Sequence, residues 1–205
     1  MKKYSADIIK RDKLIVVMNG VGRYQILRTG AELFKADVPA CIIPFESDNY
    51  EQTADNMLLL SDRFGADIII GAGNISCTRQ IKAARKNGAK MVSLSLSDEK
   101  LVRYAKHKGL IVLSPASSPE EALLMTEAGA DIITIDEADD VGAFSNLSVT
   151  DSLFVGIRTP EKIGEIGDVS GYIMSEPIIT KELLEKGDYP GIKAAADKYL
   201  KKINN

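Results

Sequence analysis

The chain has 205 residues, of which 45% are apolar and 27% are charged, and its formal net charge is -3. This size and composition are typical of one globular domain, expected to span residues 1–205. The sequence contains no basic block and no run near the roughly 18 apolar residues of a membrane span. The N-terminal residues also lack the apolar core of a signal peptide. We therefore expect a cytoplasmic protein without nucleic-acid or membrane partners, in which Cys41 and Cys77 are free thiols.

A repeat organises the chain. Gly65, Gly88, Gly109 and Gly129 are spaced 20 to 23 residues apart, and each ends a helix-like stretch before a short apolar run. A helix closed by Gly and followed by a buried strand is half of a β/α unit. Repetition at this spacing predicts parallel strands joined by helical crossovers.

Extending the pattern in both directions predicts eight strands and an extra helix at 4–11 before the first of them. The predicted strands are Leu14–Asn19, Ala40–Phe45, Asp67–Ala72, Lys90–Leu96, Leu110–Pro115, Asp131–Asp136, Ser152–Ile157 and Gly171–Ser175. Eight units without a break in composition predict a (β/α)8 TIM barrel. The alternative is a doubly wound open sheet. The first strand offers only two glycines of the dinucleotide-binding fingerprint, Gly20 and Gly22, with Gln25 at the third position.

Residues that favour helix starts and ends mark the crossovers. Ser118 followed by Pro119 and Glu121 predicts a capping box, while Ser97 and Thr159 are the caps expected after the fourth and seventh strands. The sixth crossover, 138–150, has weak helical periodicity and predicts a single turn or a loop. We expect the last helix in two pieces around 187–191.

In such a barrel the functional site lies where the strands end. The polar residues at these ends are Asn19, Glu46, Asn74, Ser95, Ser114, Ser117, Thr134, Asp136, Arg158, Ser175 and Glu176. Each also has a structural interpretation, as a helix cap or a loop hydrogen bond. That alternative is weaker for Glu46, Asn74 and Asp136, because each ends a stretch of mostly apolar residues.

Three segments carry a family resemblance. Ile68-Ile69-Ile70-Gly71-Ala72-Gly73-Asn74 resembles the VGAGT strand of the 2-keto-3-deoxy-6-phosphogluconate (KDPG)/4-hydroxy-2-oxoglutarate aldolases. The segment from Ile111 to Ala122 is similar to that family's LLPGVATPTE block, and 127–134 to its EAGYDALK block. The resemblance runs without a gap from about Ala66 to Asp136.

The resemblance implies a class I aldolase that assembles as a trimer. In this family a Lys at the end of the sixth strand forms a Schiff base with a 2-oxo acid, and a Glu on the second strand moves protons. An Arg on the second strand and groups on the third hold the carboxylate, and glycines after the last two strands hold a phosphate.

This sequence differs from the family at these positions. Thr134 stands where the resemblance places the Lys, and Ile43 and Ser47 stand at the Glu and Arg positions, with Glu46 close by. Asn74 replaces the Thr of the third strand, and could still donate a hydrogen bond to a carboxylate. After the last two strands, Gly156-Ile157-Arg158 and Ser175-Glu176-Pro177 replace the glycine-rich phosphate turns.

We therefore predict a barrel that acts on or binds a small 2-oxo acid without imine chemistry. One hypothesis is a lyase in which Glu46, Thr134 or Asp136 is catalytic and Asn19, Asn74, Ser95, Arg158 and Ser175 bind substrate. No cofactor is predicted, although a divalent metal among Asp136, Glu137 and Glu176 would be one route to aldol cleavage. The other hypothesis is an inactive barrel that binds a small ligand or a partner protein. An isomerase or synthase of another phosphate-binding barrel family fits less well, because that too would need a glycine-rich phosphate turn.

Overall fold

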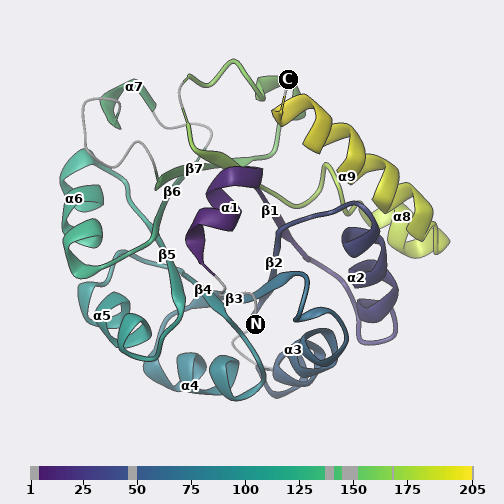
Figure 1. Ribbon diagram of the computed structural model, residues 1–205, viewed down its shortest axis with the longest axis horizontal. Coiled ribbons are helices and arrows are strands. Elements are labelled where there is room, and N and C mark those ends of the chain that lie inside the picture. The colour runs from purple at the N-terminus through teal and green to yellow at the C-terminus, as the bar shows by residue number, and fades with distance from the viewer. Residues whose placement is uncertain (1–4, 46–49, 137–140, 145–151, 168, 205) are drawn as a thin grey trace.

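Eight parallel strands pair in sequence order and close into a barrel, because the last strand pairs with the first. The computed structural model describes residues 5–45, 50–136, 141–144, 152–167 and 169–204. Figure 1 shows the strands as a central ring with helices around it. The strands are β1 Leu14–Val17, β2 Ala40–Pro44, β3 Ile69–Ile75, β4 Met91–Leu94, β5 Ile111–Pro115, β6 Ile132–Asp136, β7 Leu153–Ile157 and β8 Gly171–Met174. The predicted TIM barrel is confirmed, and the open sheet is excluded.

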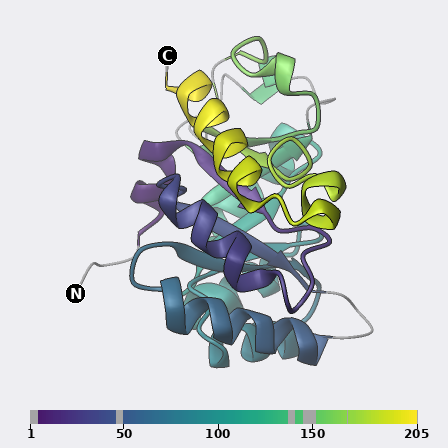
Figure 2. The ribbon, with the colours of Figure 1, turned by 90° about the vertical axis from the view of Figure 1, so that its right-hand side faces the viewer.

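Helices alternate with the strands along the described parts of the chain. They are α1 Ala6–Asp12, α2 Ile26–Lys35, α3 Tyr50–Phe64, α4 Thr78–Lys86, α5 Glu99–His107, α6 Pro119–Ala128, α7 Val141–Phe144, the 3-10 turn η2 Pro160–Lys162, α8 Lys181–Lys186 and α9 Tyr189–Ile203. In the side view of Figure 2, α9 lies along α2 on the outside of the barrel.

Most predicted helix boundaries agree with the structure. The Ser118 hydroxyl accepts from the Glu121 N–H at 3.3 Å, while the Glu121 carboxylate accepts from the Ser117 N–H at 2.8 Å. The cap predicted at Ser97 is wrong. Asp98 caps α5 instead, because its carboxylate accepts from two N–H groups of the first turn, and Ser97 donates to the Pro115 carbonyl at 3.0 Å.

Three strands end two or three residues from their predicted ends. One is β4, which stops at Leu94 instead of Leu96. β1 stops at Val17, two residues before Asn19, because the chain turns at Gly20, where φ is +68°. β3 continues to Ile75, since the Ile75 carbonyl still accepts from the Ser95 N–H at 3.0 Å. The single turn predicted within 138–150 is α7, and the last helix divides at Gly187, as expected.

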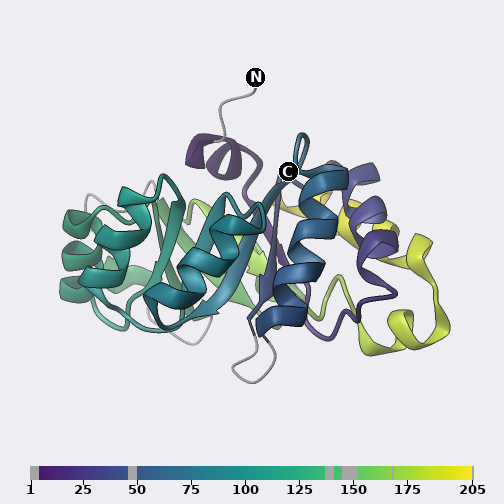
Figure 3. The same cartoon turned by 90° about the horizontal axis from the view of Figure 1, so that it is seen from below.

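The buried side chains form two layers. Alternate strand residues, among them Ile15, Ile42, Ile132 and Phe154, fill the inside of the barrel, and the residues between them pack against the helices. The extra helix α1 places the fully buried Ile9 against the inner layer. In Figure 3, α1 lies across one end of the barrel. Access to the interior is therefore from the other end, where the strands finish.

The two cysteines differ in environment, which predicts different reactivity. Cys41 is buried, and burial raises the pKa of its thiol to about 12, whereas Cys77 is exposed. Because the thiolate is the reactive form, Cys41 stays protonated at neutral and mildly alkaline pH. We expect Ellman's reagent to label one thiol per chain in the native protein at pH 8 and both in denaturant. Rapid labelling of two thiols in the native protein would contradict this assignment.

Within the described residues no helix is long and apolar enough to cross a membrane.

Candidate functional site

Three adjoining hollows lie where the strands end, and Asn19 lines all of them. The first, called the mouth hollow, has a volume of about 340 Å³ and lies between the ends of β1, β6, β7 and β8. The second, of about 270 Å³, lies between the β1–α2 loop and α3. The third, of about 470 Å³, lies between that loop and α8. The volumes of the first and third hollows fall in the range that suits small organic ligands.

The structure brings four of the predicted site residues together at the mouth hollow. They are Asn19, Asp136, Arg158 and Ser175, with Glu176 beside them. Neighbouring strand ends explain this, because Asp136 pairs with Gly156 across β6 and β7, and β8 pairs with both β7 and β1. Asn74, Ser95 and Thr134 line none of the three hollows.

An ion pair joins Asp136 and Arg158. The Arg158 Nη2 donates to the Asp136 Oδ2 at 2.8 Å, and the two side chains keep 80% and 42% of their surface exposed, in that order. Solvent screens a pair this exposed, so it holds the two groups only weakly. A guanidinium in this position can receive the carboxylate of a small acid. Asp136 can accept a proton, as a general base requires.

Ser175 lies beneath the same hollow. Its carbonyl accepts from the N–H groups of Ile178 and Ile179 at 3.0 and 2.8 Å and so starts the turn after β8. Its hydroxyl oxygen is buried and has no hydrogen-bond partner among the described residues. Buried hydroxyls normally have one, so this group is a candidate for contact with a bound water or ligand after a small side-chain rotation.

Thr134 faces the barrel interior below the mouth. Ile132 belongs to the inner layer, and Ile133 and Ile135 belong to the outer layer, so alternation turns Thr134 inward. Its side chain is partly buried, and it pairs with Pro115 of β5 and Phe154 of β7. Thr134 is thus one inward position deeper than Asp136.

On β2 the same inward and outward alternation corrects the expectation that Ile43 stands at the family's Glu position. Ile42 is in the inner layer, so Ile43 faces the helices and is 5% exposed. Position 43 therefore cannot present a side chain to the barrel interior. Glu46 and Ser47 lie outside the described residues.

The other two predicted binding residues, Ser95 and Asn74, lie in places where the local structure explains them. Ser95 donates its hydroxyl to the Ile75 carbonyl at 3.2 Å, which is the loop hydrogen bond considered as its alternative. Asn74 has a left-handed backbone, with φ of +56°, at a bulge in the pairing of β3 with β4. Asn tolerates this conformation better than other non-glycine residues. The exposed Asn74 side chain lies at the rim of the barrel.

The described part of the chain contains no cluster of three His, Cys, Asp or Glu side chains that could hold a metal ion. Of the acids expected around the mouth, Asp136 and Glu176 are described, and Glu137, Asp139 and Asp140 lie outside the described residues. The described residues therefore provide no ligand set for the divalent metal considered as one route to aldol cleavage.

The role of Gln25 was not evident from the sequence. Its Oε1 accepts from the Gly22 N–H at 3.0 Å, and its Nε2 donates to the Leu184 carbonyl at 3.0 Å. Gln25 thereby ties the β1–α2 loop to α8 and lines the third hollow. In the sequence, Gly20, Gly22 and Gln25 matched only part of a dinucleotide-binding fingerprint, and the fold shows that the Gln25 side chain holds this turn.

No protein-family model matches the chain. Among curated proteins it is 25% identical over 122 residues to the 2-dehydro-3-deoxy-6-phosphogalactonate aldolase of Escherichia coli K12. That match covers 60% of this chain and 58% of the relative, so it spans less than two thirds of that protein.

Solved structures agree over nearly the whole chain. A structure described as native KDPGal superimposes with a TM-score of 0.81 at 21% identity and covers 93% of this chain and 94% of the other. KDPG aldolase from Legionella pneumophila, with pyruvate captured as a covalent carbinolamine intermediate, gives 0.79 at 13% identity, with 97% and 99% covered. The chain therefore has the fold of these aldolases and a distant sequence similarity to one of them.

Proposed function

We propose that this barrel binds a small 2-oxo acid at the mouth hollow and does not use lysine imine chemistry. The observation that carries the proposal is the inward position on β6, where Thr134 stands in place of an amine. None of the eight described strands contains a lysine, so no strand offers a substitute. A hydroxyl cannot form the iminium that acts as the electron sink in a class I aldolase.

The mouth has groups for carboxylate binding and proton transfer. Arg158 would bind the carboxylate of the 2-oxo acid, and its partner Asp136, released from the ion pair, would accept a proton from a 4-hydroxyl group. Breaking the bond between C3 and C4 then leaves an aldehyde and the enolate of the 2-oxo acid. That enolate needs a positive partner, which Arg158 or a metal bound with the substrate would supply.

A binding barrel without turnover is the second candidate, and the same Thr134 favours it. Release of pyruvate from a panel of 4-hydroxy-2-oxo acids, measured with and without Mg²⁺ or Mn²⁺, separates the two. Metal-dependent release supports the lyase. A ligand that raises the melting temperature without being cleaved supports the binding barrel.

The role of Arg158 gives a quantitative test. Replacing it in Arg158→Gln removes the cation but keeps hydrogen-bonding groups, and we expect pyruvate to bind roughly 10-fold more weakly. The control is Arg103→Gln on α5, which removes an exposed arginine that pairs with Glu99 and lines none of the three hollows at the mouth. Titration calorimetry measures both affinities. Equal affinities for pyruvate in the two variants would contradict the proposed carboxylate site.

A further inference from the structure

A second hollow opens on the opposite face of the barrel, where the strands begin. It has a volume of about 730 Å³ and lies between the C-terminal ends of α4 and α5 and the starts of β4 and β5. We call it the basic hollow. The mouth hollow is at the other ends of the strands, so a ligand here would not occupy the proposed 2-oxo acid site.

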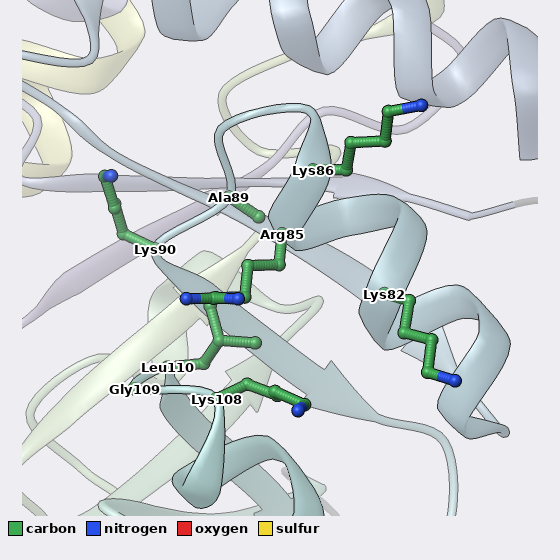
Figure 4. A pocket seen from close by; sticks show the side chains of 8 residues that line it. All are labelled: Lys82, Arg85, Lys86, Ala89, Lys90, Lys108, Gly109 and Leu110. Atoms are coloured by element: carbon green, nitrogen blue, oxygen red, sulfur yellow. The ribbon is translucent and has the colours of Figure 1, made fainter.

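Five of the eight residues that line the basic hollow are cationic, and none of the eight is acidic. The cations are Lys82, Arg85, Lys86, Lys90 and Lys108. The whole chain carries 26 Lys and Arg against 29 Asp and Glu, so this concentration does not reflect the overall composition. In Figure 4, the Arg85 side chain lies between those of Lys90 and Lys108, while the ammonium ends of Lys82 and Lys86 point away from it.

The ends of the helices explain only part of this clustering. Arg85 and Lys86 lie in the last turn of α4, where positive charge complements the helix dipole. However, Lys82 lies one turn earlier and Lys90 lies beyond the helix. The carbonyls at the end of α4 already accept hydrogen bonds from backbone N–H groups and from the Asn87 side chain.

The neighbouring Lys106 shows how a cation is neutralised in this fold. It makes an ion pair with Asp131 at 2.7 Å. In contrast, Lys82, Arg85 and Lys86 have no ion pair with any residue that the structure describes, and Lys108 lies over the Tyr104 ring at 5.2 Å. Three exposed cations without acidic partners in the described part of the chain, beside two more, form a strongly positive surface that a multiply charged anion would neutralise.

Two buried apolar residues also line the basic hollow. Ala89 and Leu110 are buried at 3% and 4% exposure and begin the segments that lead into β4 and β5. Gly88 and Gly109 adopt left-handed backbones, with φ of +93° and +75°, and turn the chain sharply from each helix into its strand. These turns hold the cations of two neighbouring β/α units around one space.

We propose that the basic hollow binds a chain of phosphate groups, either as free oligophosphate or as the phosphate tail of a nucleotide. A planar guanidinium between two lysines can bind one phosphate through two hydrogen bonds, and the ammonium groups of those lysines can bind the neighbouring ones. A single phosphate would meet only part of this set of cations.

Calorimetric titration with sodium tripolyphosphate at low ionic strength tests the proposal. We expect one saturable site per chain, with an affinity that falls steeply as salt is added. The triple variant Lys82→Gln/Arg85→Gln/Lys108→Gln should bind roughly 10-fold more weakly or worse. Because these side chains make no ion pair among the described residues, its melting temperature should stay near that of the unaltered protein.

The control has the same loss of charge at a distant place. Lys193→Gln/Lys198→Gln/Lys201→Gln removes three cations from α9, on the far side of the ring from α4 and α5, and Lys198 lies over the Tyr199 ring as Lys108 lies over Tyr104. Its affinity should change less than about twofold. Equal weakening in both variants, or no saturable binding, would overturn the proposal.

A second titration identifies the source of the phosphates. ATP that binds more tightly than tripolyphosphate would identify a nucleotide, and equal or weaker binding would identify the free phosphate chain. Pyruvate affinity measured alongside is independent of this result, so failure here leaves the mouth proposal standing.

Discussion

Replacing Phe154 with alanine should destabilise the protein by about 3–5 kcal/mol, the cost of deleting a large buried aromatic side chain. Phe154 is fully buried on β7 and fills the inside of the barrel. Its ring lies against Gly171 of β8, where a Cβ added to the glycine would come within 2.4 Å of the ring. The absence of a side chain at Gly171 therefore leaves room for this ring, and deletion of the ring would open a cavity between β7 and β8.

Urea denaturation followed by circular dichroism measures this loss, since the chain has no tryptophan to report it. The control is Phe34→Ala on α2, where the ring is 43% exposed and we expect a loss below about 1 kcal/mol. If Phe154→Ala cost no more than Phe34→Ala, the interior would not be packed as the structure indicates.

Introducing a lysine by Thr134→Lys should create a covalent pyruvate adduct, which we do not expect on the unaltered chain. The new amine would extend from an inward, partly buried position on β6 toward the mouth. Partial burial disfavours the protonated amine and leaves more of the free base to attack the pyruvate carbonyl. Loss of water gives the iminium, and borohydride delivers hydride to its carbon to fix the adduct as a secondary amine.

Mass spectrometry after borohydride treatment with pyruvate is the measurement, at mildly alkaline pH. The unaltered protein should gain no adduct, whereas Thr134→Lys should gain one reduced pyruvate per chain. Leu96→Lys is the control, because it adds a lysine just after β4 where the side chain is 72% exposed. An adduct on the unaltered protein would reveal a reactive lysine elsewhere and overturn the loss of imine chemistry. An adduct on both variants would show that position 134 has no special role.

Much of the fold could be predicted because its signals are local. Gly88, Gly109 and Gly129 end helices in the left-handed conformation that favours glycine, and the apolar runs after them are strands buried on both faces. The helix caps could not all be predicted from local sequence. Ser97 and Asp98 are adjacent and chemically alike, so only the path of the chain decides that Asp98 caps α5 while Ser97 reaches the Pro115 carbonyl.

Part of the candidate site could also be predicted, because the strand order follows from the same local signals. Strand order places the ends of β6, β7, β8 and β1 side by side, so Asp136, Arg158, Ser175 and Asn19 meet at one hollow. Ser95 could not be separated from them by sequence, because a hydroxyl after a strand serves equally as a ligand group or as a loop donor. Its hydrogen bond to Ile75 depends on the pairing of two strands.

By itself the sequence determined the barrel and the absence of a lysine from the sixth strand, since both depend on residue type and spacing along the chain. The tertiary structure decided which side chains are in contact and which way they face. It paired Asp136 with Arg158, turned Ile43 away from the interior, and gathered cations from two helix ends around the basic hollow. These contacts join residues brought together by barrel closure and by packing between neighbouring β/α units, which no local pattern encodes.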